Sequence, residues 1–166
     1  MLRFTTAPTP FGEMTIVTTE HGVLRTILAG EDPAVELERV EEARAERARR
    51  DDRRLSPFRR ELRAYFARGL RTFATPVDRS FARTAFSGRV VEAAMRVPYG
   101  QLRTYGDLAA EAGSPRAWRA AGHAMRVCPV ELWIPCHRIV PSGPGFGEYG
   151  GHPERREWLL RLEGAI

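Results

Sequence analysis

The sequence contains no lysine, only two cysteines and no long apolar run. Two cysteines are too few for a disulfide scaffold. No apolar run approaches the roughly 20 residues that a membrane-spanning helix needs, and the first residues hold no apolar core of signal-peptide length. We therefore expect a cytoplasmic protein with free thiols that neither crosses a membrane nor is secreted.

The sequence also lacks cysteines and histidines at the spacing that is typical of metal sites. Cys128 and Cys136 do not form the C-x2-C pattern of a zinc site, and no two histidines are paired at ligand spacing. We predict that the protein holds no metal ion.

The positive charge is carried by arginine alone. All 26 cationic residues are arginine, and the formal net charge is +5. Arginine is always charged and presents forked donors that suit phosphate. A basic balance points toward nucleic acid, although many basic proteins bind none. The composition therefore permits a nucleic-acid partner without establishing one.

The first half of the chain predicts strands followed by helices. Residues 1–19 are rich in β-branched and aromatic types, with a break at Pro10–Gly12, and a second strand runs over 23–28 after a turn at His21–Gly22. This pattern predicts a hairpin or meander. The charged segment 33–54 favours a solvated helix.

A second helix is expected from Ser56, as N-cap, to a stop at Gly69, with Pro57 at the first helical position. The segment 72–84, which contains Pro76, is the expected linker. We predict two domains, residues 1–80 and 81–166.

The second half predicts helices over 86–96, 105–112 and 116–125. Thr104 can cap the middle helix, because Asp107 stands three residues further on, as in a capping box. Helix, short glycine-containing turn and helix is the arrangement of a helix-turn-helix, although many helix corners share it and bind nothing. The fold class is α+β or α/β: a small N-terminal antiparallel sheet with helices, then a helical domain with a winged helix-turn-helix.

The helix expected at 116–125 is rich in small residues. They are Ala117, Ala120, Ala121, Gly122 and Ala124. Small residues let a backbone approach a neighbour closely, and that neighbour is either another helix or a nucleic-acid groove.

A candidate nucleophile lies in the apolar segment 132–140, LWIPCHRIV, which we interpret as a strand. Pro135 removes a backbone donor before Cys136, while His137 and Arg138 add a titratable base and a positive charge that favour a thiolate. An inert packing cysteine is the alternative, since buried cysteines are usually unreactive.

Several segments together resemble one family. IPCHRIV resembles the active-site signature of the methylated-DNA–protein-cysteine methyltransferases, also called O6-alkylguanine-DNA alkyltransferases. VPYGQLRTYGDLAAEAG and SPRAWRAAGHAM resemble the family's helix-turn-helix, and YGG followed by EWLLRLEG resembles its C-terminal segment. The detailed similarity covers residues 56–164.

The resemblance implies a single-turnover DNA repair protein. Cys136 would take an alkyl group from O6 of guanine, His137 would accept the thiol proton through a water, and Glu163 would orient His137. Tyr105 would supply a proton or donor to the guanine oxygen. No cofactor is implied, because the alkyl donor is the damaged DNA.

The resemblance also implies how duplex DNA containing O6-alkylguanine is bound, by a protein expected to be a monomer. The target base must be flipped out of the helix. Arg119 would fill the vacated stack, Ala120 and Gly122 would face the groove, and Arg126 would contact phosphate. Met125, Tyr149 and Gly150 would line the base pocket.

In isolation, each of these residues has a plainer interpretation. Tyr105 fits a core position, Arg119 a surface position, Glu163 a solvated position and His137 a structural one. Cys128 also departs from the family, which usually has asparagine there, and we expect a looser hinge, a slower transfer or a disulfide with Cys136. Two other functions stay open: sensing damaged DNA without transfer, and acting on a small alkylated metabolite.

Overall fold

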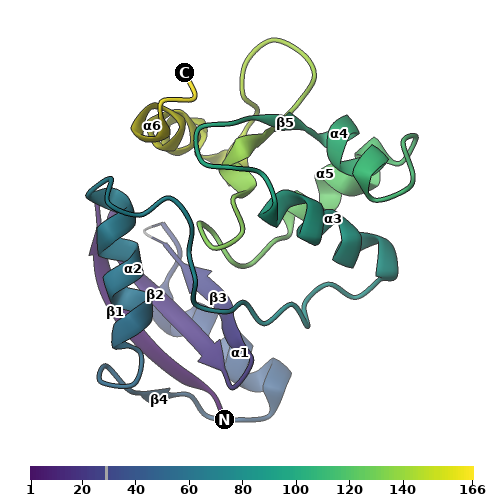
Figure 1. Ribbon diagram of the computed structural model, residues 1–166. Coiled ribbons are helices and arrows are strands. Elements are labelled where there is room, and N and C mark those ends of the chain that lie inside the picture. Colours follow the sequence, from purple (N-terminus) through teal and green to yellow (C-terminus); the bar gives the residue numbers. More distant parts are fainter. Residues whose placement is uncertain (29) are drawn as a thin grey trace. The chain divides into compact units, whose positions relative to one another are not determined.

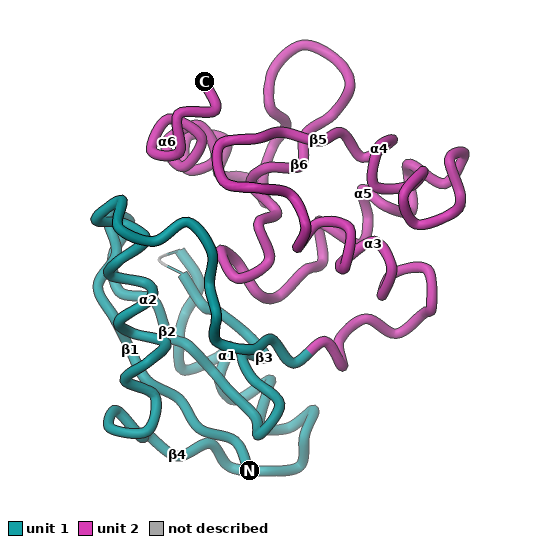
Figure 2. Tube along the Cα trace, viewed as in Figure 1, with its two compact units in different colours: residues 1–78 teal, residues 79–166 magenta. Residues whose placement is uncertain are grey.

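The computed structural model describes residues 1–28 and 30–166, which divide into two compact units (Figure 2). Unit 1 comprises Met1–Asp78 and unit 2 comprises Arg79–Ile166. Unit 1 is built on a sheet and unit 2 is mainly helical (Figure 1), so the predicted α+β class is confirmed. No described helix is long and apolar enough to cross a membrane.

The sheet of unit 1 has four strands in the order β3-β2-β1-β4. They are β1 (Arg3–Thr9), β2 (Gly12–Thr19), β3 (Gly22–Ile27) and β4 (Arg49–Arg50). The first three pair antiparallel in chain order, which confirms the predicted meander, and β4 joins β1 in parallel.

Two helices accompany the sheet, α1 (Pro33–Arg44) and α2 (Ser56–Phe66). Leu37 and Val40 of α1 pack against a buried cluster formed by Leu2, Val17, Leu24 and Ile27. Helix α2 lies against β1 and buries Leu62 and Tyr65 (Figure 1). Residues 14–18 of β2 are all buried, as expected for a strand that is covered on both faces.

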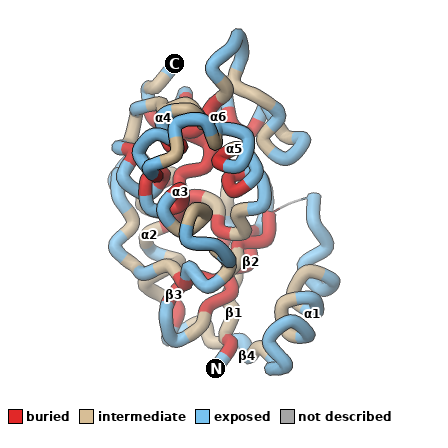
Figure 3. Tube along the Cα trace, turned by 90° about the vertical axis from the view of Figure 1, so that its right-hand side faces the viewer, coloured by how far each residue is buried: buried red, intermediate tan, exposed pale blue. Residues whose placement is uncertain are grey.

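The helix expected over 33–54 ends ten residues earlier, at Arg44. Ala45 adopts the left-handed conformation, with φ 49° and ψ 36°, and its N–H donates to the carbonyls of Glu41 and Glu42. A few residues later the chain joins the sheet as β4. Helix α1 has no buried residue (Figure 3), so the thin apolar pattern could not mark where it ends.

Both predicted ends of α2 were wrong. Leu55 is the N-cap and makes no side-chain cap bond, because the chain enters through a turn in which Asp51 accepts from the backbone N–H of Arg54 and Leu55. The helix ends at Phe66, since Arg68 takes a positive φ of 61° before Gly69 is reached.

Part of the expected linker belongs to unit 1. Val23 N–H donates to Pro76 O at 2.9 Å, and Asp78 N–H donates to Val23 O at 2.8 Å. Gly22 is needed for this approach, because a Cβ there would lie 2.2 Å from Pro76 O and its φ is +127°. The segment therefore extends the edge of the sheet at β3.

Unit 2 contains four α-helices, two short strands and two 3₁₀ turns among its residues, all of which are described. They are α3 (Ala85–Met95), β5 (Arg103–Thr104), α4 (Tyr105–Glu111), α5 (Trp118–Arg126), η1 (Cys136–Arg138), β6 (Ile139–Val140), η2 (Tyr149–Gly151) and α6 (Pro153–Glu163). The predicted capping box at the start of α4 is present: Thr104 N–H donates to Asp107, and Asp107 N–H donates to Thr104. Helices α4 and α5 contact each other across a short turn; the wing stays a prediction.

The segment 132–140 is not the continuous strand that its apolar character suggested. Cys136–Arg138 forms the 3₁₀ turn η1, and only Ile139–Val140 pairs in parallel with β5. Backbone bonds from Cys136 N to Ile134 O and from Arg138 N to Pro135 O close this turn. The directions of the three side chains in η1 are therefore set by a turn and not by strand alternation.

Candidate active site

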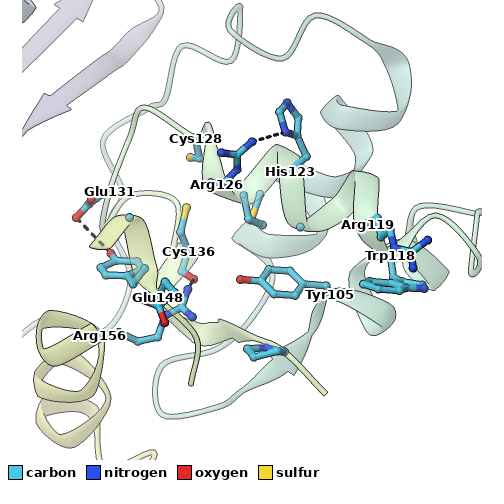
Figure 4. Close-up of a pocket in the computed structure, with 15 residues that line it drawn as sticks. Tyr105, Trp118, Arg119, His123, Arg126, Cys128, Glu131, Cys136, Glu148 and Arg156 are labelled. Carbon is cyan, nitrogen blue, oxygen red and sulfur yellow. Dashed lines mark hydrogen bonds between the residues drawn. The ribbon is translucent and has the colours of Figure 1, made fainter. Parts of the chain in front are cut away.

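A cavity of about 580 Å³ opens in unit 2, and Cys136 lies in its wall (Figure 4). Helices α4, α5 and α6, the turns η1 and η2 and the segment 128–131 all contribute to its lining. The side chain of Cys136 is buried, with 5% of its surface exposed. The candidate nucleophile is therefore largely shielded from solvent and borders this cavity.

The side chains of Cys136 and Cys128 are neighbours in the wall of the cavity (Figure 4). Cys128 donates its own hydrogen bond to Val130 O, with its Sγ at 3.7 Å. Both cysteines are free, so the disulfide considered above is not formed. The neighbouring side chain of Cys128, burial and the charge of Glu131 together raise the pKa of Cys136. In the unbound protein, Cys136 is thus held as a neutral thiol.

Two charged residues face Cys136 from other parts of the chain. The carboxylate of Glu131 raises the pKa of the thiol, and the guanidinium of Arg156 lowers it. Arg156 is buried in α6, where its Nη2 donates to Cys136 O at 3.4 Å and its Nη1 donates to Phe146 O. Its Cζ also lies 4.7 Å from the centre of the Tyr149 ring. Arg156 therefore links helix α6 to the loop that contains Phe146 and to the turn η1 that contains Cys136.

His137, Arg138 and Glu163 form one buried cluster. His137 Nε2 lies 2.8 Å from Glu163 Oε1, while Arg138 donates to both carboxylate oxygens at 2.9 Å. Glu163 Oε2 also accepts from Gly100 N–H at 3.0 Å. The last turn of α6 is thus fixed to η1 and to the loop before β5.

The electrostatics of this cluster favour a neutral histidine beside an ionised carboxylate. Burial lowers the pKa of His137, and its bond to Glu163 offsets only part of that effect. Burial alone would raise the pKa of Glu163, but its bonds to His137 and Arg138 hold it far below the usual range. A neutral imidazole is the form that can accept a proton.

The sequence suggested that Arg138 favours a thiolate at Cys136, but in the structure its guanidinium binds other groups. Its guanidinium is used by Glu163 and by Val97 O, which accepts from Nη1 at 2.7 Å. The cation that stabilises a thiolate at Cys136 is Arg156 instead. The 3₁₀ turn explains the difference, because it directs consecutive side chains to different surroundings.

The remaining pocket residues of the sequence analysis also line the cavity: Tyr105, Met125, Tyr149 and Gly150. The hydroxyl end of Tyr105 points toward Cys136 (Figure 4). Tyr149 donates to Glu131 Oε2 at 3.2 Å, and burial together with the charge of Glu131 raises its pKa. The cavity thus brings two phenols to the candidate nucleophile.

The predicted DNA-facing residues lie on α5 at the cavity mouth. Arg119, Ala120 and Arg126 are exposed, and Arg119, Arg126 and Gly122 line the cavity. Gly122 is half-buried, and a Cβ there would lie 3.7 Å from the Tyr105 ring. A side chain as small as alanine at this position would therefore make an ordinary van der Waals contact with Tyr105.

The cavity residues that sequence reasoning missed include Glu131, Trp118 and Arg156. Arg156 and Glu163 stand two turns apart on α6, so helical spacing would have placed them on one face. Trp118 is an exposed aromatic at the start of a helix that is otherwise rich in small residues. Nothing in the sequence around Glu131 indicates its place. Among residues 1–28 and 30–166, no group of three or more His, Cys, Asp or Glu side chains could hold a metal ion.

The fold and the cavity define a two-unit protein whose helical unit presents one cysteine beside a basic helix. The family model for the DNA-binding domain of 6-O-methylguanine DNA methyltransferase matches residues 85–165, and the model for the ribonuclease-like domain of the same family matches residues 2–79. The chain belongs to the 6-O-methylguanine DNA methyltransferase family.

Named relatives are similar in sequence to this protein along most of its length. A constitutive methylated-DNA–protein-cysteine methyltransferase from Bacillus subtilis is 34% identical over 161 residues, covering 96% of this chain and 94% of the relative. A methylated-DNA–protein-cysteine methyltransferase from Mycolicibacterium paratuberculosis is 32% identical, with coverages of 98% and 93%. The crystal structure of the O6-methylguanine methyltransferase of Mycobacterium tuberculosis is similar, with a TM-score of 0.82, 30% identity and coverages of 99% and 94%.

Proposed function

We propose that this protein repairs O6-alkylguanine in duplex DNA by transferring the alkyl group irreversibly to Cys136. The observation that carries the proposal is the placement of Cys136 in the wall of a cavity, in a turn whose histidine is bound to a buried glutamate. Membership of the family agrees with it, and the solved relatives include the M. tuberculosis protein in complex with DNA, which has a TM-score of 0.79 and 28% identity.

The proton of the thiol is proposed to move to His137. Glu163 is bound to Nε2, so Nδ1 is the nitrogen that would receive the proton, through a water. Glu163 acts as a positioning residue: its negative charge stabilises the imidazolium once that has formed. Because burial and Cys128 keep the thiol protonated in the free protein, this transfer belongs to the DNA-bound state.

The transfer itself forms one bond and breaks another. Cys136 Sγ attacks the alkyl carbon, the bond from that carbon to O6 breaks, and its electron pair stays with the guanine. Tyr105, whose hydroxyl points toward Cys136, would donate to the departing guanine (Figure 4). The products are S-alkylcysteine and guanine, so each molecule reacts once and needs no metal or cofactor.

The DNA would be held on α5. Arg119 would occupy the place left by the flipped base, Ala120 and Gly122 would face the minor groove, and Arg126 would contact a phosphate. Met125, Tyr149 and Gly150 would surround the flipped base. The small side chains of Ala120, which is exposed, and Gly122, which is half-buried, suit a close approach of the DNA backbone.

We place the protein in the cytoplasm, where a reducing environment keeps Cys128 and Cys136 as thiols. We also propose that it acts as a monomer, because one chain supplies every group that the proposed reaction uses, in the cavity wall and in the buried cluster behind it. Sedimentation or light scattering at the concentrations used for activity would show a mass near 18.7 kDa.

The test is the intact mass after incubation with a duplex that carries one O6-methylguanine. We expect a single gain of about 14 Da, mapped to the peptide that contains Cys136 and absent from Cys136→Ala. Cys128→Ser is the matched control and should gain the same mass. A bound duplex without a mass gain would indicate damage sensing without transfer. Neither binding nor gain would favour a small alkylated metabolite.

A further inference from the structure

An exposed tryptophan begins α5 at the mouth of the cavity. Trp118 keeps half of its surface exposed, and it lines the same cavity as Cys136. The guanidinium carbon of Arg119 lies 4.6 Å from the centre of the Trp118 ring (Figure 4). Successive residues on a helix do not normally face each other. The stacked pair is therefore a particular feature of this helix start.

The surroundings of Trp118 suit a polyanion with aromatic faces. Arg116, Arg119 and Arg126 are all exposed on α5 or just before it. The acidic residue exposed in the cavity lining is Glu148, on the opposite loop. Proteins that bind nucleic acid combine such cations with aromatic rings on which bases stack.

We propose that Trp118 is a DNA-contacting residue whose indole stacks on a nucleobase beside the flipped one while it holds the guanidinium of Arg119. This inference rests on the proposed function of the cavity. The ring has no charge to offer a phosphate, so its contribution is a flat apolar surface. Apolar side chains inserted between base steps are a common device of proteins that bend or open the minor groove.

The two side chains would make different contacts with the DNA. Arg119 is the longer and charged member, suited to occupy the space left by the flipped base. Trp118 supports it from the side and contacts the neighbouring base. Stacking accepts every base, so Trp118 would strengthen binding without adding sequence preference.

The first experiment is a fluorescence titration with duplex DNA, with and without O6-methylguanine. We expect the tryptophan emission of the wild type to be quenched when DNA binds, and the quenching to be lost in Trp118→Phe. Trp158→Phe is the matched control, because Trp158 is also exposed but lies on α6, outside the cavity lining. That variant should be quenched like the wild type.

The second experiment measures affinity and transfer in the same variants. Trp118→Ala should weaken duplex binding about 5- to 100-fold, the range for loss of one stacked base, while Trp118→Phe keeps most of the affinity. Trp118→Leu, which has apolar bulk but no aromatic face, should resemble Trp118→Ala. The losses from Trp118→Ala and Arg119→Ala should not add in the double variant, because the two side chains act as one unit.

Two results separate failure of this inference from failure of the proposed function. If the wild type binds and transfers but Trp118→Ala and Trp118→Leu do so equally well, Trp118 makes no important contact and the inference is wrong. If the wild type neither binds the duplex nor gains mass, the proposed function itself fails. The thermal unfolding of every variant is measured alongside, and Trp118→Phe keeps the test decisive if the alanine variant unfolds.

Discussion

His137 Nε2 and Glu163 Oε1 lie 2.8 Å apart, and neither side chain is exposed to solvent. The same carboxylate also receives two bonds from Arg138. A buried carboxylate that is shared by a cation and an imidazole stabilises the fold, and in the proposed function it also takes part in the reaction.

Glu163→Gln should lower the free energy of unfolding by about 3–5 kcal/mol, since it leaves the charge of Arg138 buried without its counter-ion. Methyl transfer should also slow, because the imidazolium of His137 loses its stabilising charge. Denaturant unfolding and single-turnover kinetics measure the two effects.

Glu157→Gln is the control on the same helix. Glu157 pairs with Arg161 at 3.8 Å on the exposed face, with 48% and 67% of the two side chains exposed. Such a pair contributes at most about 1 kcal/mol. Equal losses in the two variants would contradict the importance of the buried cluster.

Stability should fall as the solution is made acidic. The folded protein holds the pKa of His137 below 6.5 and that of Glu163 below 4.5, so the unfolded chain binds more protons than the folded one. Their contribution is therefore complete above about pH 6.5 and is lost progressively as the pH falls through these values and below. Denaturant midpoints between pH 8 and pH 4 measure this slope, and a stability that does not fall over this range would show that the groups are not shifted.

Cys128→Ala should make Cys136 more reactive at neutral pH. The neighbouring side chain of Cys128 is the largest cause of the raised pKa of Cys136, and each unit by which the pKa falls gives about ten times more thiolate. The rate of alkylation by iodoacetamide as a function of pH, followed on the Cys136 peptide, gives the midpoint. Cys128→Ser keeps a hydrogen-bond acceptor, so its midpoint should stay closer to that of the wild type.

Tyr105→Phe should slow methyl transfer by at least about tenfold while leaving duplex affinity near that of the wild type, since general-acid groups typically contribute about 10²–10⁴ in rate. The ring packs against Gly122 in both proteins, so the shape of the cavity is retained. Rapid-quench measurement of transfer and a separate binding titration distinguish the two quantities. A loss of affinity with unchanged transfer would assign Tyr105 to binding alone.

Arg126→Ala should weaken binding to all duplexes about equally and reduce the slope of log K against log salt by about 1, which is the effect of losing one phosphate contact. Arg126 is exposed, and its Nη2 lies 3.0 Å from His123 Nδ1, so its removal should not disturb the fold. Arg161→Ala, on the exposed face of α6, is the matched loss of charge and should leave the slope unchanged.

Local signals in the sequence predicted much of the fold. The capping box at Thr104 marked the start of α4 correctly, and Pro57 marked the first turn of α2, because both signals depend on residues only a few positions apart. The end of α1 was missed, since it depends on Ala45 taking a left-handed conformation that alanine rarely adopts.

The resemblance to a known family predicted part of the site, and the sequence predicted less of the remainder. It assigned roles to His137 and Glu163, and the structure places the two in contact, but spacing alone could not pair residues so far apart in the sequence. The partner of Arg138 depends on the direction of a 3₁₀ turn, which the neighbouring residues do not reveal. The contact between Cys128 and Cys136 likewise arises only when the chain folds back after α5.

Cys136, the proposed nucleophile, contributes little to the architecture around it. Its backbone N–H bonds Ile134 O and its carbonyl accepts from Arg156, and both bonds would survive replacement of the side chain. The buried charges belong to other residues, and losing one of those costs far more. A lineage descended from this protein could therefore lose the reaction through one codon change and still inherit an intact fold and helix α5. Inheritance of the chemistry and inheritance of the shape are separable in this molecule.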